Sequence, residues 1–288
     1  MSQKKPTIVL VPGAWHTPDI YSPFIPHLTS AGYKTVTVTL PSVGCSPPVN
    51  DLQPDAQAVR NAVASCIEKG QDVVLFMHSY GAVPACEGIK GMAKSPSSSN
   101  EEGTKGGITH LVFCSAFVLP AGVAVLDPRQ GEPETWFQVN EDATIVNPAT
   151  PMDTFYNDLT PEIAKHLTEA CVRPQSFKTF LTKPQYAAWQ DEADLPCTYI
   201  FTEKDQPQSF KTFLTKPQYA AWQDEADLPC TYIFTEKDQC VPYVVQKIMV
   251  ERSGREFKTE TFDMGHSPFV RSPEQIANVV RKAAGESL

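Results

Sequence analysis

One short stretch of this chain joins a buried strand, a polar turn and the start of a helix. Residues 73–77 form an uninterrupted apolar run, the pattern of a parallel strand with helices on both faces. Ser79 and Tyr80 follow this run, and small apolar residues at helical spacing begin after Gly81. A strand that passes at once into a helix lifts the turn side chain above the sheet edge and aims the helix N-terminus at it. We therefore expect Ser79 to be a nucleophile, with the backbone amide of Tyr80 placed to donate to an oxyanion.

The segments around this stretch predict an alternation of strands and helices. Residues 7–11 and 34–40 are rich in β-branched residues, as strands are, whereas residues 53–69 carry apolar residues at helical spacing. Further strand patterns follow at residues 108–117 and 257–262. Such an order demands a parallel sheet with right-handed crossovers. The expected fold class is α/β, with a mostly parallel, doubly wound sheet.

Two segments break this alternation. Between residue 119 and about residue 173, prolines and aromatic residues replace the strand pattern, and we expect a helical cap whose aromatic residues pack it onto the core. Residues 93–107 are rich in Ser, Gly and charged residues without an apolar period, and we expect an exposed loop there.

A tandem duplication follows, because residues 174–206 are identical, residue for residue, to residues 207–239. Two copies with no repeat-family signature argue against a solenoid. Each copy holds a strand-like Cys-Thr-Tyr-Ile-Phe segment that leads to an aspartate, so there are two candidate acids, Asp205 and Asp238. Only Asp238 runs straight into the apolar-periodic helix that starts near residue 242. We therefore expect Asp238 to act, and the surplus copy with Asp205 to lie outside the sheet.

A histidine completes the arrangement. His266 follows the strand pattern of residues 257–262, so Ser79, Asp238 and His266 each come after a predicted strand, in the order serine, acid, histidine. An imidazole in this place can take the proton of a serine hydroxyl, while a carboxylate fixes its tautomer. His16, in the turn after the first strand, is expected to be a polar residue at a helix N-terminus or a pocket rim instead.

Three motifs carry a resemblance to the α/β-hydrolases. Met-His-Ser-Tyr-Gly at residues 77–81 resembles their G-x-S-x-G nucleophile elbow, with Met77 in place of the first glycine. Pro-Gly-Ala-Trp at residues 12–15 resembles the oxyanion loop of the esterase and hydroxynitrile lyase branch, and Gly-His-Ser-Pro-Phe at residues 265–269 resembles the histidine loop.

The resemblance implies one α/β-hydrolase domain over residues 1–288. Its core would be residues 1–118 and about 229–288, with the cap and the duplicated segment in about 119–228. It also implies that the amide of Ala14, or that of Trp15, is the second oxyanion donor beside Tyr80.

Charge and cysteine usage limit the partners. With 24 basic and 33 acidic residues the net charge is −9, and no basic run exceeds Lys4-Lys5, so nucleic acid and membrane surfaces are not expected partners. The apolar run after these lysines is too short for a signal peptide or a membrane span, which favours a cytoplasmic protein. The eight cysteines have no metal-binding spacing, and no dinucleotide fingerprint is present, so we expect no metal and no cofactor.

These observations favour hydrolysis of an ester, lactone or thioester of a small apolar metabolite. Two alternatives stay open. A carbon–carbon lyase of the hydroxynitrile type shares the triad, but the lyases that the chain resembles use a lysine beside the histidine, where this chain has Ser267. The same fold could also serve as a small-molecule receptor without catalysis.

Overall fold

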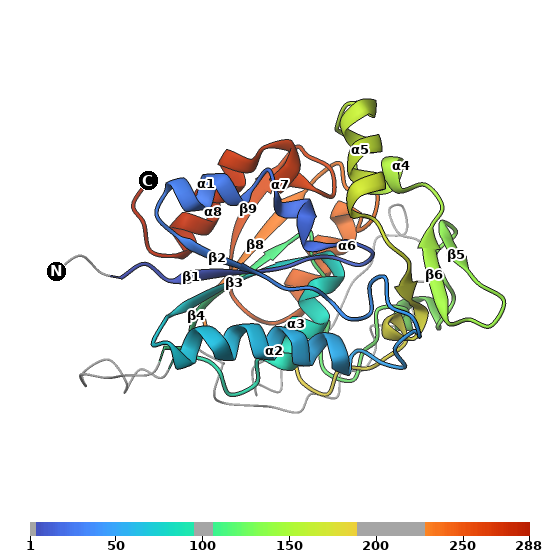
Figure 1. Cartoon of the computed structure of the whole chain (residues 1–288), viewed down its shortest axis with the longest axis horizontal. Coiled ribbons are helices and arrows are strands. Elements are labelled where there is room, and N and C mark those ends of the chain that lie inside the picture. Colours follow the sequence, from blue (N-terminus) through green and yellow to red (C-terminus); the bar gives the residue numbers. More distant parts are fainter. Residues whose placement is uncertain (1–3, 95–105, 189–227) are drawn as a thin grey trace.

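The protein is built around a six-stranded sheet in which every pair of neighbouring strands is parallel. The structure, a computed structural model, describes residues 4–94, 106–188 and 228–288. The strand order is β2-β1-β3-β4-β8-β9 (Figure 1). The strand bounds are β1 Thr7–Val11, β2 Lys34–Thr37, β3 Val73–His78, β4 Ile108–Cys114, β8 Cys230–Thr235 and β9 Phe257–Phe262.

Burial explains why the apolar runs occupy the middle of this sheet. Every residue of β1, β3 and β8 is buried, whereas the edge strands β2 and β9 have no buried residue. Strands covered on both faces need continuous apolar sequence, and edge strands do not. The run that ends at Ser79 therefore lies centrally, between β1 and β4.

Helices cover both faces of the sheet. In Figure 1, α2 and α3 lie below it, and α1 and α8 lie above. Helix α8 turns Ile276, Val279 and Val280 inward, as its apolar spacing predicts. The helix bounds in the core are α1 Ile25–Ser30, α2 Gln53–Glu68, α3 Ala82–Gly88, α6 Tyr243–Arg252, α7 Pro268–Arg271 and α8 Pro273–Ala283.

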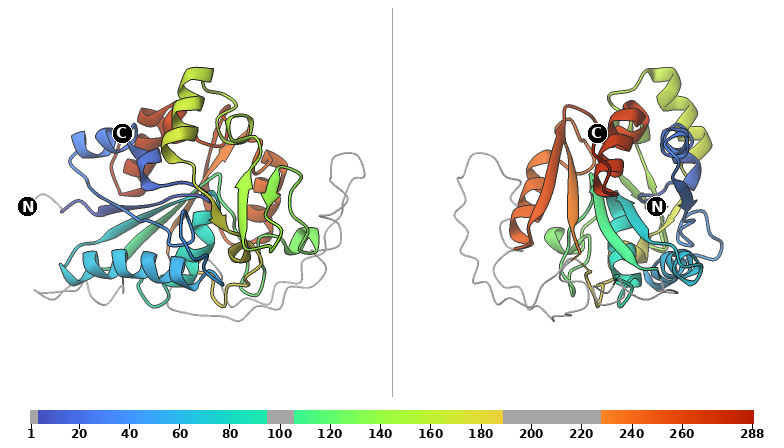
Figure 2. Two further views of the ribbon diagram at one scale, coloured as in Figure 1. Left: turned by 45° about the vertical axis from the view of Figure 1, so that its right-hand side comes forward. Right: turned by 90° about the vertical axis from the view of Figure 1, so that its left-hand side faces the viewer.

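A cap lies beyond the carboxyl ends of the strands, between β4 and β8 in sequence (Figures 1 and 2). It holds helices α4 Pro151–Phe155 and α5 Pro161–Cys171 and an antiparallel sheet in the order β5-β6-β7. These strands are β5 Phe137–Val139, β6 Ile145–Pro148 and β7 Gln175–Ser176. The sequence did not predict them, because segments of two to four residues are too short to show a period of two.

The two copies of the duplication contribute to different parts of the fold. The second copy supplies β8, which pairs with β4 on one side and β9 on the other. The first copy supplies β7 and the turn Phe177–Phe180 in the cap. The first copy's strand-like residues 197–201 and Asp205 lie outside the described residues, as do residues 95–105 of the expected loop.

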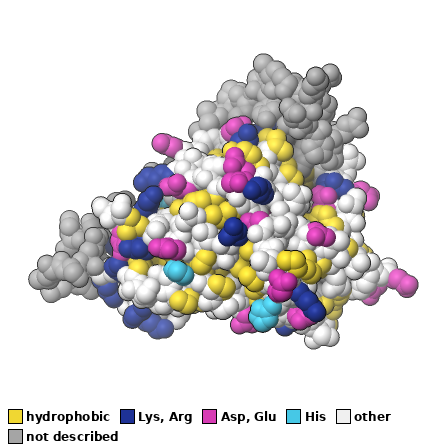
Figure 3. Space-filling model, turned by 90° about the horizontal axis from the view of Figure 1, so that it is seen from above, with side chains coloured by type: hydrophobic (Ala, Val, Ile, Leu, Met, Phe, Trp, Pro, Cys, Tyr) yellow, Lys and Arg dark blue, Asp and Glu magenta, His cyan; other side chains and the backbone are white. Residues whose placement is uncertain are grey.

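The outer surface is mixed in charge. On the face shown in Figure 3, basic and acidic side chains are interspersed. Within the described ranges, no helix is both long and apolar enough to cross a bilayer.

Candidate active site

Ser79 lies in a strained turn at the end of β3. Its φ is +52°, a left-handed conformation that a residue with a side chain rarely adopts, and Ser79 is 4% exposed. Gly81 is required here, since a Cβ at this position would lie 2.2 Å from the carbonyl oxygen of Pro12. Met77 does not prevent the turn, because its side chain is fully buried in β3. Strain of this kind is typical of functional sites.

His266 and Asp238 form a buried pair. The Nδ1–H of His266 donates to Asp238 Oδ2 at 2.9 Å, and both side chains are almost inaccessible to solvent. Burial alone would lower the pKa of His266, but its interactions with the Asp238 carboxylate and with Cys240 together outweigh burial and raise that pKa above its ordinary value. The imidazole also contacts the thiol of Cys240, whose own pKa burial raises, so that it is a neutral neighbour.

The Asp238 carboxylate is held by four further hydrogen bonds. Its Oδ1 accepts from the amides of Cys240 and Val241, each at 2.8 Å, and its Oδ2 accepts from Thr235 Oγ1 and Gln246 Nε2, each at 3.1 Å. Gln246 also accepts from the Thr235 amide and donates to the Val241 carbonyl. This network fixes the orientation of the carboxylate, and hence of His266.

His78 connects the elbow to the loop of His266. Its Nε2–H donates to the His266 carbonyl at 2.9 Å, and the two rings have centroids 4.6 Å apart. Burial, together with the neighbouring His266 and His16, lowers the pKa of His78 well below its ordinary value, so the ring is neutral. Ser79 directly follows His78, so this hydrogen bond ties the turn that holds Ser79 to the backbone of the His266 loop at the carboxyl edge of the sheet. No hydrogen bond joins Ser79 to His266 in the described structure, and such bonds are often long before substrate binds.

The loop of residues 12–15 holds the two backbone amides expected as oxyanion donors, those of Ala14 and Trp15, and the structure distinguishes between them. The amide of Trp15 donates to Gln175 Oε1 at 2.7 Å, so it is engaged by the cap and is not available to an oxyanion. The expectation for Trp15 is corrected on this ground, and Ala14 remains. Among the described backbone hydrogen bonds, none is donated by Ala14 or Tyr80. Both residues line the same pocket as Ser79.

His16 supports this loop from behind. Its Nδ1–H donates to the Ala14 carbonyl at 2.7 Å, and its Nε2 accepts from the Tyr156 hydroxyl at 2.7 Å. Burial lowers the pKa of His16 to about 4, so it is neutral. His16 thus ties the oxyanion loop to the cap and has no free nitrogen for proton transfer.

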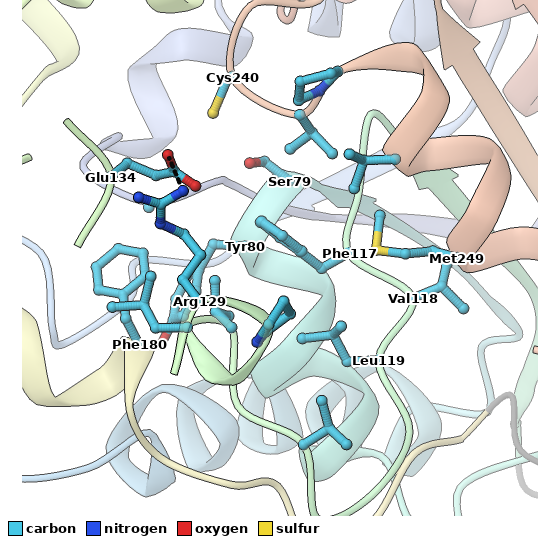
Figure 4. Close-up of a pocket in the computed structure, with 18 of the residues that line it drawn as sticks. Ser79, Tyr80, Phe117, Val118, Leu119, Arg129, Glu134, Phe180, Cys240 and Met249 are labelled. Atoms are coloured by element: carbon cyan, nitrogen blue, oxygen red, sulfur yellow. Dashed lines mark ion pairs between the residues drawn. The ribbon is translucent and has the colours of Figure 1, made fainter. Parts of the chain in front are cut away.

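A pocket opens in front of Ser79, between the core and the cap (Figure 4). Its volume is about 170 Å³. Most of its lining is apolar, and includes Phe117, Val118, Leu119, Phe137, Val245 and Met249. Its charged lining residues are Arg129, Glu134 and Arg252. A pocket of this composition suits an apolar small molecule with few polar groups.

The described residues offer no group of three or more His, Cys, Asp or Glu side chains that could hold a metal ion. The seven described cysteines are all free.

Comparison with known proteins identifies the family. A sequence model described as "Alpha/beta hydrolase family" matches residues 8–279. The chain belongs to the α/β hydrolase family. The predicted family and fold class are thereby confirmed.

Two curated relatives resemble the chain over nearly its whole length. The alpha/beta hydrolase nvfD of Aspergillus novofumigatus is 27% identical over 99% of this chain and 98% of its own. A probable hydrolase of Phoma sp. is 26% identical over 98% of this chain and 99% of its own.

Solved structures share the hydrolase fold at lower identity. A pyrethroid hydrolase of Sphingobium faniae has a TM-score of 0.66 and 17% identity, and each chain is 97% covered. A methylesterase from Arabidopsis has a TM-score of 0.67 and 17% identity, covering 96% of this chain and 98% of its own. Polyneuridine aldehyde esterase has a TM-score of 0.64 and 19% identity, covering 97% and 99%.

Sequence reasoning missed three residues at this candidate site. Gln246 is the buried polar residue of α6, and a lone polar residue on the apolar face of a helix is the signal that could have revealed it. Arg129 ends a one-turn 3-10 helix, Asp127–Arg129, Glu134 lies in the irregular segment that follows, and no local pattern marks either as lining a pocket.

Proposed function

We propose that this protein is a serine hydrolase that cleaves a carboxylic ester, lactone or thioester of a small apolar metabolite. Ser79 is the nucleophile, His266 the general base and Asp238 the acid that orients it. His266 Nε2 takes the proton of Ser79 Oγ as this oxygen attacks the substrate carbonyl. The leaving group departs with that proton, and a water molecule, activated by the same imidazole, then releases the acid from the acyl-enzyme.

The negative oxygen formed during both attacks needs donors. The amides of Ala14 and Tyr80 are the proposed pair, because both line the pocket beside Ser79 and neither has another described partner. Fixed backbone donors in a water-poor pocket stabilise developing charge strongly.

The observation that carries the proposal is the buried His266–Asp238 hydrogen bond behind a serine held at positive φ on the wall of an apolar pocket. Fold relatives named as esterases and hydrolases are consistent with it. The proposed steps use only side chains, amides and water, so we expect no cofactor. The free cysteines favour work in a reducing compartment such as the cytoplasm.

The residues of the site support the hydroxynitrile-lyase alternative less well than ester cleavage. Ser267 stands next to His266, and the basic residues of the pocket are arginines on the η4 turn, Asp127–Arg129, and on α6. A receptor needs no serine held in a strained turn, which costs folding energy without aiding binding.

A fluorophosphonate probe tests the proposal, because it labels only an activated serine. We expect stoichiometric labelling and turnover of p-nitrophenyl esters, both lost in Ser79→Ala. Ser267→Ala is the matched control, since Ser267 is buried beside His266 but does not line the pocket. Labelling that survives in Ser79→Ala, or a wild type that is neither labelled nor active, would contradict the proposal.

A further inference from the structure

An ion pair lies in the mostly apolar pocket of Ser79, whose third charged lining residue is Arg252. Arg129 Nη1 and Glu134 Oε2 are 3.3 Å apart, and the two side chains are 26% and 37% exposed. Figure 4 shows both side chains on one side of the pocket, across from Met249 of α6, with the Ser79 hydroxyl between them and that helix. Burial is the main cause that raises the pKa of Glu134, and the charge of Arg129 opposes it. Charges in such a place cost desolvation energy, which calls for a role.

The backbone that carries the pair is firmly held. The amide of Arg129 donates to the Leu126 carbonyl at 3.0 Å, and that of Glu132 donates to the Arg129 carbonyl at 3.0 Å. The Glu134 carbonyl accepts from the amide of Phe137, the first residue of β5, at 2.9 Å. The two charged groups are thus presented to the pocket by an ordered segment, as a recognition element requires.

The pair keeps unused hydrogen-bonding capacity. Among the described residues, the contact within the pair uses a single carboxylate oxygen, and Arg129 otherwise reaches only the carbonyls of Glu132 and Pro133, both at 3.3 Å. Those distances are longer than the usual 2.7–3.2 Å or so for N–H···O bonds. A carboxylate has about four acceptor sites and a guanidinium five donors. A ligand group that enters the pocket can therefore bond to both side chains without separating them.

The sign of the charges selects the ligand group. A carboxylate beside Arg129 would also lie beside Glu134, and an ammonium beside Glu134 would also lie beside Arg129. A hydroxyl suffers neither repulsion, because it donates to the carboxylate and accepts from the guanidinium at once. We propose that the substrate is an apolar ester or lactone with a hydroxyl group remote from the scissile carbonyl, and that Arg129 and Glu134 bind this hydroxyl. The inference rests on the proposed ester cleavage at Ser79.

The cavity limits what lies between the two polar ends. Its volume of about 170 Å³ is close to the roughly 150 Å³ of a cavity that holds benzene. A single ring or a short chain fills such a space. The hydroxyl should therefore be separated from the ester carbonyl by about that length.

The test uses matched esters. p-Nitrophenyl esters of straight-chain acids of graded length are compared with those of the corresponding ω-hydroxy acids and of the half-acids that end in a carboxylate. The proteins are wild type, Glu134→Gln, Arg129→Met and the control Glu132→Gln, which changes the same charge on an exposed side chain outside the pocket. Thermal melting confirms that each variant is folded.

At one chain length, the wild type should prefer the hydroxy ester by about tenfold in kcat/KM, mainly through KM, as expected for one hydrogen bond to a charged group. Glu134→Gln and Arg129→Met should each reduce this preference to about threefold or less, and Glu132→Gln should keep it. Glu132→Gln should also hydrolyse p-nitrophenyl acetate as the wild type does, whereas the two pocket variants are judged by their ratio of hydroxy-ester to plain-ester kcat/KM.

Three results overturn the inference while ester cleavage at Ser79 stands. One is a wild type that hydrolyses plain and hydroxy esters equally at every length, and another is a preference for the carboxylate-ended esters. A hydroxyl preference that persists in both pocket variants overturns it as well. A wild type that cleaves no ester and takes up no fluorophosphonate overturns the proposed function itself, and this inference with it.

Discussion

The substitution Asp238→Asn probes the pair on which the proposed mechanism depends. The carboxylate accepts five hydrogen bonds, two at Oδ1 from backbone amides and three at Oδ2 from His266, Thr235 and Gln246. An asparagine must keep its oxygen toward the two amides, so its NH₂ faces His266. The imidazole then accepts at Nδ1 and carries its proton on Nε2, the nitrogen that should take the proton of Ser79.

The expected loss follows from this wrong tautomer. A change of this kind in serine proteases lowers kcat by about 10,000-fold, or about 5 kcal/mol of transition-state stabilisation. Folding suffers less, because the one unavoidable conflict is that the new NH₂ meets the NH₂ of Gln246. That should cost about 1–3 kcal/mol of unfolding free energy. The variant should therefore be folded and nearly inactive.

The pH profile gives an independent readout. The base must be neutral to act, so kcat/KM rises as pH increases through the pKa of His266. Because Asp238 raises that pKa above its ordinary value of 6.5, the midpoint of the acid limb in wild type should lie above pH 6.5. In Asp238→Asn, burial acts without the opposing charge, and the midpoint of the residual activity should move to lower pH.

The chain supplies a matched control for this experiment. Asp205 has the same flanking sequence as Asp238 up to the glutamine that follows, so Asp205→Asn makes the same chemical change in the other copy. We expect Asp205→Asn to keep wild-type kcat/KM in assays of p-nitrophenyl butyrate hydrolysis. If Asp205→Asn loses activity while Asp238→Asn keeps it, Asp205 is the acid and the reasoning is refuted. A folded Asp238→Asn with full activity refutes it as well.

The other predictions concern the same site. Ser79→Ala and His266→Ala should each remove nearly all turnover, and the double variant should be little worse, as measured by kcat, because members of a triad act as a unit; additive losses would contradict this. Gln246→Leu should lower the melting temperature and kcat together, because it leaves the buried Thr235 amide and Val241 carbonyl without their hydrogen bonds. Each unsatisfied group should cost about 1–3 kcal/mol of unfolding free energy, and an unchanged melting temperature would argue against the network. Cys240→Ala should retain activity and raise kcat/KM by up to about tenfold. The neutral thiol makes a contact with the imidazole of His266, worth about 0.5–1.5 kcal/mol, that competes with the action of His266 as a base, and the substitution removes this contact. Inactivity of the variant would show that the thiol takes part in the reaction. Dialysis against a chelator should leave ester hydrolysis unchanged, and a loss that zinc restores would exclude the metal-free mechanism.

The sequence predicts the core of this fold because its local and global signals agree. The apolar run of β3 can be satisfied only between two other strands with helices on both faces, which is where it lies. Ser79, Asp238 and His266 follow β3, β8 and β9 in the chain, and parallel strands bring their carboxyl ends to one edge of the sheet. Their proximity is a consequence of topology, so it could be expected without coordinates.

The structure of the cap and the residues that line the pocket could not be predicted from the sequence in this way. The amide of Trp15 is taken by Gln175, a contact across 160 residues that no local pattern specifies. The position of Trp15 as an oxyanion donor therefore depended on the cap, whose short strands carry no periodic signal. The same holds for Arg129 and Glu134, because an irregular segment gives no face to which a side chain can be assigned in advance.

The described parts of the two duplicated copies are complementary. Described residues 174–188 of the first copy lie in the cap, and described residues 228–239 of the second supply β8 and Asp238, so together they amount to nearly one copy. The side chain of Cys86 contacts the backbone of Ala188 and also interacts with Cys230, so both ends of this division lie near one residue of α3. In a chain with a single copy, six residues would join Ala188 to Leu228, and six residues reach about 20 Å. By the loop-closure relation for an unstructured chain, lengthening a connection from six residues to the 39 between the described segments costs only about 2 kcal/mol of closure entropy. The site is therefore compatible with one copy of the duplicated segment or with two. Asp238 differs from Asp205 in its direct connection to α6.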